Sequence, residues 1–175
     1  GASTGGFTDV LLRRGASLVV AVDVGYGQLA WELRQDPRVK VLDRTNIRHL
    51  TGEQVGEDID LVVADLSFIS LSLVLPALAA VSKPEADFVL MVKPQFEVGR
   101  EKLGAGGVVR DPALRRAAVL DVAESAYDVG LGTMGIAASP LPGPAGNVEY
   151  FLWLRRGAPE IDEAALDTAI AMGPA

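Results

Sequence analysis

The sequence predicts an α/β protein with a mostly parallel, doubly wound sheet. Short runs of β-branched and other apolar residues, typical of buried parallel strands, alternate with stretches of helical character. Glycine, proline and small polar residues separate the two kinds of segment. A chain of 175 residues is long enough for one domain with a sizeable core.

Buried strands are expected wherever a β-branched run ends at a charged residue. These runs lie at 17–23, 39–43, 60–65 and 88–93. Two further segments, 132–141 and 147–156, follow the last long helix and are interpreted as a terminal antiparallel pair. The expected order therefore ends in a hairpin-like addition to a parallel sheet.

Helices are expected between the strands and at the end of the chain, at 8–15, 27–36, 71–81, 111–130 and 162–172. Thr8 is a possible N-cap of the first, and Pro76 obscures where the third begins. Asp111-Pro112 gives the fourth a cap and a first-turn proline, and Gly130 ends it. The polar, glycine-containing loop 97–112 is a candidate mobile lid, and the segment after 157 is expected to be a dispensable tail.

Composition excludes several classes of function. The chain has no cysteine and a single histidine, His49, so disulfides and zinc sites are not expected. It has neither an uncharged apolar run long enough to span a membrane nor a signal-peptide pattern, which favours a cytoplasmic protein. The net charge of −7 argues against a surface that binds nucleic acid everywhere. Residues 1–50, however, carry seven Lys/Arg and five Asp/Glu, so a polyanion would approach this part.

The chain opens with the glycine-rich turn GASTGGFTDV, before any segment that could be a strand. Such a turn lets a ligand approach the backbone closely at the N–H groups of a helix N-terminus. It does not fit the dinucleotide pattern, which needs glycine at position 3, and no Lys-Ser/Thr follows as in a Walker A loop. A tight connection without a ligand stays open as an alternative. Because the turn normally follows the first strand of the sheet, we expect that central strand upstream of Gly1.

Asp23 lies at the end of the second expected strand, about twenty residues after the turn. In nucleotide-binding α/β folds, an acid at this place accepts hydrogen bonds from ribose hydroxyls. A solvated strand end is the alternative. Tyr26 and Leu29, in a second glycine turn, could pack on a sugar or base, or serve ordinary packing.

Three charged residues are expected at one edge of the sheet. Asp65 and Lys93 end their strands, and Glu149 lies in the last one. Strand ends converge on the ligand crevice of a parallel sheet. A lysine between two carboxylates can orient a hydroxyl, stabilise a developing alkoxide and accept its proton. A structural ion pair is the alternative.

The motifs GASTGGFTD, DVGYGQLAW, LVVADLSFISL, VKPQFEVGR, GGVVRDP and SPLPGPAGNVEYFLWLR resemble the TlyA family. These are bacterial ribosomal-RNA 2′-O-methyltransferases, related to FtsJ-like enzymes and also called hemolysins. The resemblance covers residues 1–156, interpreted as an FtsJ-like methyltransferase domain that is incomplete at its N-terminus, with 157–175 as the C-terminal tail.

The resemblance implies a Rossmann-like fold that binds S-adenosylmethionine and methylates a ribose 2′-hydroxyl, with cytidines of 16S and 23S rRNA as the expected targets. It implies catalytic roles for Asp65, Lys93 and Glu149, the last three members of a Lys-Asp-Lys-Glu tetrad whose first lysine would lie upstream. It also implies an upstream S4-type RNA-binding domain, ribosomal RNA or ribosomal subunits as partners, and no metal. The cofactor residues it implies are Gly1, Ala2, Ser3, Gly5, Gly6, Phe7, Asp23, Val24, Thr45, Asn46, Asp65 and Leu66.

Three other functions remain as alternatives. A nicotinamide-dependent oxidoreductase would share the topology, but the glycine spacing and the terminal strand pair argue against it. A membrane-acting hemolysin would need a spanning segment or a strongly basic amphipathic face. A scaffold that only binds a nucleoside would not need the Asp-Lys-Glu set.

Overall fold

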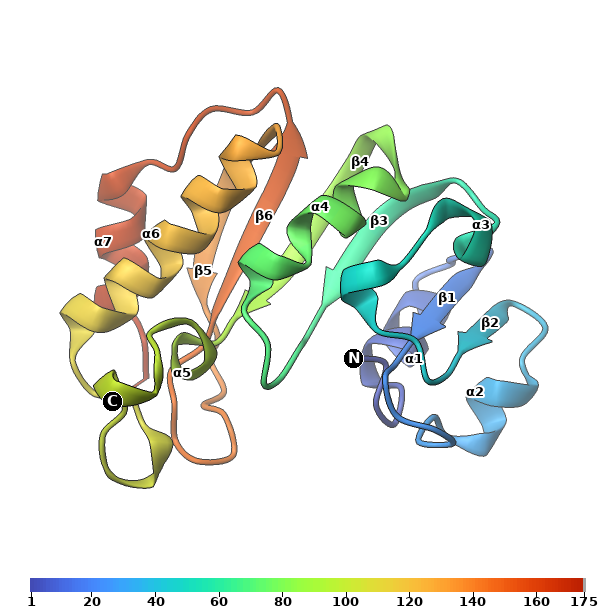
Figure 1. The fold of residues 1–175 in the computed structure, drawn as a ribbon, viewed down its shortest axis with the longest axis horizontal. Helices are drawn as coiled ribbons and strands as arrows, with labels where there is room; N and C mark the ends of the chain where they lie inside the picture. Colours follow the sequence, from blue (N-terminus) through green and yellow to red (C-terminus); the bar gives the residue numbers. More distant parts are fainter. Residues whose placement is uncertain (175) are drawn as a thin grey trace. The chain divides into compact units, whose positions relative to one another are not determined.

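The computed structural model describes residues 1–174, which form two compact units (Figure 1). Unit 1 comprises Gly1–Glu57, and unit 2 begins at Asp58. Each unit has its own sheet, a two-stranded sheet in unit 1 and a four-stranded sheet in unit 2.

Unit 1 is built around two parallel strands, with Val19 opposite Val39 in the register. Its buried apolar side chains come from the first helix, the first strand, the second glycine turn and the segment 50–55, and include Leu12, Ala21, Leu29 and Val55. Its elements are α1 (Gly6–Arg13), β1 (Val19–Val22), α2 (Trp31–Gln35), β2 (Val39–Leu42), η1 (Ile47–His49) and α3 (Gly52–Val55).

The first helix starts earlier than the sequence predicted. Gly5, not Thr8, is the N-cap residue, and Thr8 lies inside the helix with its side chain buried. Gly5 has a left-handed φ of 108°, and a Cβ there would collide with Leu33 and Leu29. Only glycine meets both conditions, which is why the helix begins at this residue.

Unit 2 contains a sheet of order β3-β4-β6-β5 with helices packed on it. Its elements are β3 (Ile59–Ala64), η2 (Leu71–Leu73), α4 (Leu75–Ala80), β4 (Ser82–Val92), α5 (Pro94–Glu97), η3 (Arg100–Lys102), η4 (Ala105–Gly107), α6 (Pro112–Asp128), β5 (Leu131–Ala138), β6 (Tyr150–Arg156) and α7 (Glu163–Ala171).

The pairing of the strands confirms the predicted fold class. β1 and β2 are parallel, as are β3 and β4, whereas β6 runs antiparallel to both of its neighbours, β4 and β5. The helix predicted at 71–81 is divided into η2 and α4, with Pro76 in the first turn of α4. Proline is accommodated there because first-turn N–H groups have no partner within the helix.

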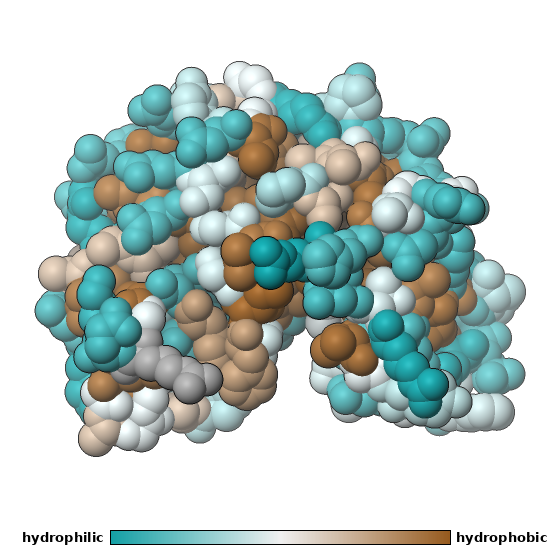
Figure 2. All heavy atoms as spheres, in the orientation of Figure 1, coloured by the Kyte–Doolittle hydropathy of each residue, from teal (hydrophilic) through white to brown (hydrophobic). Residues whose placement is uncertain are grey.

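The longest helix, α6, packs its apolar side on the sheet, as predicted from its Asp111 cap and Pro112 start. Its outward side is mostly hydrophilic (Figure 2). α7 lies beside α6 (Figure 1), and Arg116 of α6 pairs with Glu163 and Asp167 of α7. Leu166 of α7 is fully buried. The segment expected to be a tail therefore contributes to the core of unit 2.

The loop expected to be a mobile lid has its own structure. It contains η3 and η4, and its ends place Val98 and Val109 in a small apolar cluster with Ala118. The buried Asn147, which follows this loop much later in the chain, fixes the end of the loop with its side-chain amide. Its oxygen accepts from the Val109 amide at 2.9 Å, and its nitrogen donates to the Gly107 carbonyl at 3.0 Å. Mobility of the segment between these points stays a prediction.

Candidate active site

The structure brings the three charged residues of unit 2 together. Lys93 Nζ lies 2.6 Å from Asp65 Oδ1 and 3.9 Å from Glu149 Oε1. It also donates to Ser67 Oγ at 3.4 Å. The Lys93 side chain is 12% exposed, so its ammonium meets protein oxygens more than water.

The strand directions explain why these residues meet. Asp65 and Lys93 follow the carboxyl ends of β3 and β4, whereas Glu149 directly precedes β6. Because β6 is antiparallel to β4, with Tyr150 opposite Val92, its beginning lies at the edge where β3 and β4 end. The antiparallel pairing is therefore required to bring the second acid to the lysine.

The two carboxylates have different surroundings. Asp65 is 40% exposed and makes the short contact with the ammonium, whereas Glu149 is only 7% exposed and lies farther from it. Glu149 Oε1 accepts a hydrogen bond from Gln95 Nε2 at 3.3 Å. The backbone of Gly143 closes in on the same oxygen, since a Cβ at this residue would lie 2.6 Å from it.

Ser67, Gln95 and Gly143 were not predicted from the sequence. A signal was present for the first two, because each is polar and lies two residues after a predicted catalytic residue, Asp65 or Lys93. For Gly143 the sequence offered only its place in the SPLPGPAGN turn.

Two aromatic side chains lie on the segments that carry Ser67 and Gln95. Phe68 is 90% exposed and has a left-handed φ of 65°, which is costly for an aromatic residue. Its ring stacks at a tilt on Phe96, with 5.0 Å between the centroids. Glu97, next to Phe96, accepts a hydrogen bond from the Leu71 amide at 2.9 Å.

In unit 1 the glycine turn is held against the end of β1. The Ala2 amide donates to the Val22 carbonyl, and Ser3, at a positive φ of 49°, donates its amide to Asp23 Oδ2 at 2.8 Å. The other oxygen of Asp23 accepts from the Gly25 amide at 2.8 Å. Burial alone would raise the pKa of Asp23, but these two backbone hydrogen bonds outweigh it and lower the pKa below the ordinary value.

The remaining cofactor residues predicted in unit 1 come before and after Asp23 in the chain. Gly6, Phe7 and Val24 are exposed, and the Thr45 amide donates to the Asp23 carbonyl. Asn46 has a structural task as well, because its side chain caps η1 by accepting from the Arg48 amide.

In the second glycine turn, the ordinary-packing alternative holds for Leu29. Leu29 is buried against Gly5 and is part of the unit-1 core. Tyr26 stays 67% exposed, with the Arg44 guanidinium 4.4 Å from the centre of its ring.

Asp65 and Leu66 are the two predicted cofactor residues that belong to unit 2. Leu66 is buried, with 8% of its surface exposed, while Asp65 is committed to Lys93.

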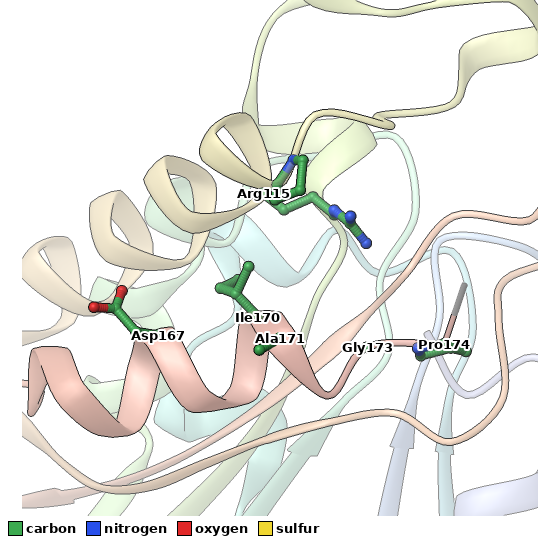
Figure 3. Close-up of a pocket in the computed structure, with 7 residues that line it drawn as sticks. Arg115, Asp167, Ile170, Ala171, Gly173 and Pro174 are labelled. Atoms are coloured by element: carbon green, nitrogen blue, oxygen red, sulfur yellow. The ribbon is translucent and has the colours of Figure 1, made fainter.

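Figure 3 shows a cavity of about 430 Å³. It is lined by Pro112 and Arg115 of α6, by Asp167, Ile170 and Ala171 of α7, and by Gly173 and Pro174 after it. None of the predicted site residues lines it. Over the described 174 residues, the helices are too short or too polar to cross a bilayer, and no three His, Asp or Glu side chains are grouped to hold a metal.

Comparisons with known proteins identify the family of the chain. The FtsJ-like methyltransferase family matches residues 1–156. A Mycobacterium tuberculosis protein named 16S/23S rRNA (cytidine-2′-O)-methyltransferase TlyA is 61% identical over 99% of this chain and 67% of its own length. A solved structure of a Streptococcus thermophilus protein, named a hemolysin, superposes with a TM-score of 0.93 at 42% identity, covering 98% of this chain and 63% of that one.

More distant structures share the fold. An S-adenosylmethionine-dependent methyltransferase from Listeria monocytogenes has a TM-score of 0.64 at 14% identity, over 89% of this chain and 88% of its own. The comparisons do not favour the oxidoreductase alternative. With the family matching nearly nine tenths of its length and a relative 61% identical, the chain belongs to the FtsJ-like methyltransferases.

Proposed function

We propose that this protein transfers the methyl group of S-adenosylmethionine to the 2′-hydroxyl of a cytidine ribose in ribosomal RNA. Family membership makes it a methyltransferase, and the name of the mycobacterial relative supports the RNA, the base and the acceptor oxygen. The observation that carries the proposal is the shielded Lys93 ammonium between Asp65 and Glu149.

Lys93 supplies what the acceptor hydroxyl needs. Next to two carboxylates the amine is charged, so it orients the hydroxyl oxygen and stabilises negative charge as it develops there. Lys93 takes up the proton of the hydroxyl only as it passes one of its own to Asp65 or Glu149, so the proton ends on a carboxylate. The short contact with Asp65 fixes the ammonium, since a flexible lysine loses less entropy on binding when it is already held.

Unit 1 fits the nucleoside part of the cofactor. Asp23 is ionised, and each of its oxygens uses one acceptor site for a backbone amide, of Ser3 or of Gly25. A carboxylate has about four acceptor sites, so the two hydroxyls of a ribose can still donate to it. Thr45 and Asn46 would face the adenine. When bound, S-adenosylmethionine supplies an electrophilic methyl group on a positively charged sulfur.

Phe68 supports a nucleic-acid substrate. Phe68 has a strained backbone and a 90% exposed ring that packs on Phe96, and it lies next to Ser67 in the chain. This arrangement is unfavourable for stability, so stability alone does not explain it. Bases that are unstacked from RNA bind by stacking on such rings. The excess of basic over acidic residues in 1–50 would attract the phosphate groups of an RNA.

The test is methyl transfer from tritiated S-adenosylmethionine to unmethylated 30S and 50S subunits by the full-length protein. Mass spectrometry then locates the 2′-O-methyl group. We expect label on cytidine in RNA. Label on protein or on a base carbon, or no transfer to either subunit, would contradict the proposal. Dye-loaded liposomes incubated with the same protein test the membrane-acting alternative, and we expect no leakage.

Lys93→Ala tests the residue that the proposal depends on. We expect turnover to fall by about 10²–10⁴-fold, the range for a residue handling a proton in the transition state, while S-adenosylhomocysteine still binds in calorimetry. Lys102→Ala, an exposed lysine without an ion pair in the described chain, is the matched control and should keep full activity. If the Lys93→Ala protein stays active, the role proposed for Lys93 in methyl transfer is wrong.

A further inference from the structure

We propose that Gln95 is a positioning residue for the methyl-transfer reaction, acting by holding the Glu149 carboxylate in place. The inference rests on the proposed function and adds to it a residue that neither the sequence pattern nor the relatives' names assign.

The first observation is that Gln95 is the hydrogen-bond donor to this carboxylate. Within residues 1–174, the hydrogen bond to the Glu149 side chain comes from Gln95 Nε2, at 3.3 Å. The Lys93 ammonium is 3.9 Å from the same oxygen, which is beyond hydrogen-bonding distance. Glu149 is therefore attracted by the lysine but oriented by the glutamine.

Burial makes this hydrogen bond important. Only 7% of the Glu149 side chain is exposed, so water contributes little to the solvation of its charge. A buried carboxylate needs donors in the protein to stay ionised. Gln95 provides one without adding a charge, so Lys93 remains the single cation between Asp65 and Glu149 in the described site.

The second observation is that one hydrogen-bonding atom of the Gln95 side chain has no partner. Its own amide oxygen is buried, and no hydrogen-bond donor in the described residues reaches it. A buried amide with one unpaired atom is unfavourable for folding. An apolar side chain of the same size would avoid this cost but would leave the buried Glu149 carboxylate without its donor, so the glutamine is explained by the carboxylate that it holds.

The third observation is that Gln95 and Lys93 share one rigid turn. Gln95 lies in α5, directly after Pro94, whose ring fixes the backbone at the start of the helix. The same turn is anchored on the loop after Asp65 by the contact of Phe96 with Phe68 and by the Glu97–Leu71 hydrogen bond. The turn therefore fixes both the Lys93 ammonium and the Gln95 amide that holds Glu149, and so sets the distance between the ammonium and the Glu149 carboxylate.

Loss of the Gln95 donor has a defined consequence. Glu149 would turn towards the ammonium, and this change alters how Lys93 handles the proton of the acceptor. We expect Gln95→Met to lower kcat by about 10- to 100-fold, the scale of a misplaced catalytic group, with KM for both substrates changed less than about threefold.

The experiment compares Gln95→Met, Gln95→Glu and the control Gln35→Met, an exposed glutamine in α2. Circular dichroism and S-adenosylhomocysteine binding are measured on each. Gln95→Glu keeps the shape but replaces the donor by a second carboxylate facing Glu149, so its kcat should fall at least as far. If both Gln95 variants keep kcat within about twofold of wild type, the inference is overturned.

A double-mutant cycle separates positioning from a loss of folding. Gln95→Met should have little further effect in a Glu149→Gln background, because the group it positions is already changed. Equal effects in both backgrounds would contradict the inference, whether or not the single variant is less stable. An inactive wild type would instead refute the proposed function, so the two failures are distinguishable.

Discussion

The carboxylate of Glu149 shows how a site depends on residues that carry no chemistry. Gly143 comes so close to Oε1 that a methyl group there would lie 2.6 Å from the oxygen. The Gly143 amide is at the same time tied to the Asn147 carbonyl at 2.8 Å, so the backbone has little room to retreat. The side chain of Glu149 would have to move instead.

Gly143→Ala should therefore displace Glu149 and lower methyl transfer by about tenfold or more, because a shift of 1 Å in a catalytic group has effects of this size. Cofactor binding should not change. The measurement is kcat on ribosomal subunits, with Gly52→Ala in α3 as control, since a Cβ there meets nothing within 4 Å. Equal kcat values for the two variants would show that Glu149 tolerates the displacement.

Among the elements, the single turn α5 connects most of the site. Four contacts leave α5 and its N-cap residue Lys93, from Lys93 to Asp65, from Gln95 to Glu149, from Phe96 to Phe68, and from Glu97 to Leu71. Burial raises the pKa of Glu97, the hydrogen bonds from Ser70 and the Leu71 amide oppose this rise, and Asp121 of α6 adds to it. The net direction is upward, so the fold favours the protonated acid.

This shift predicts a pH dependence of stability. A carboxyl with a raised pKa in the folded state stabilises the fold below its unfolded pKa, about 4.5, and this contribution is lost as pH rises through the folded pKa. Glu97→Gln removes the titration but keeps an acceptor for Leu71. The difference in unfolding free energy, wild type minus variant, should therefore fall between pH 4 and 8.

Urea unfolding, followed by Trp153 fluorescence in a Trp31→Phe background, measures this difference within unit 2. Glu124→Gln, exposed on α6 and without an ion pair in the described chain, is the control. If the difference in unfolding free energy for Glu97→Gln stays constant with pH, the Glu97 carboxyl is exposed to water in solution.

At the scale of the whole molecule, the family match and the packed fold end at different residues. The match stops at residue 156, yet α7 buries Leu166 completely and pairs through Glu163 and Asp167 with Arg116. The last helix is therefore a part of unit 2 that lies outside the matched region.

Leu166→Ala should lower the free energy of unfolding of unit 2 by about 2–5 kcal/mol, because it leaves a cavity in a closely packed core. Met172→Ala, at the exposed end of α7, should change it by less than about 0.5 kcal/mol. Urea titration measures both. A Leu166→Ala protein as stable as the Met172→Ala protein would show that α7 is the dispensable tail expected from the sequence.

Strand runs and helix caps could be predicted because they depend on local signals. Asp111-Pro112 and Gly130 gave nearly the true limits of α6, and the β-branched runs located most strands. The start of α1 was predicted wrongly, because it depends on how Leu29 and Leu33 fill the space beside Gly5. That contact joins residues far apart in the chain, and no local pattern reveals it.

The sequence by itself determined the fold class, the family and the identity of the three charged residues, since each depends on residue types in a local order. Only the tertiary structure decided that β6 lies between β4 and β5, that Gln95 and Gly143 enclose Glu149, and that α7 belongs to the core. The physical reason is that these are contacts between segments far apart in the chain. Their energies come from burial and hydrogen bonding after folding, when side chains without a sequence signature become neighbours.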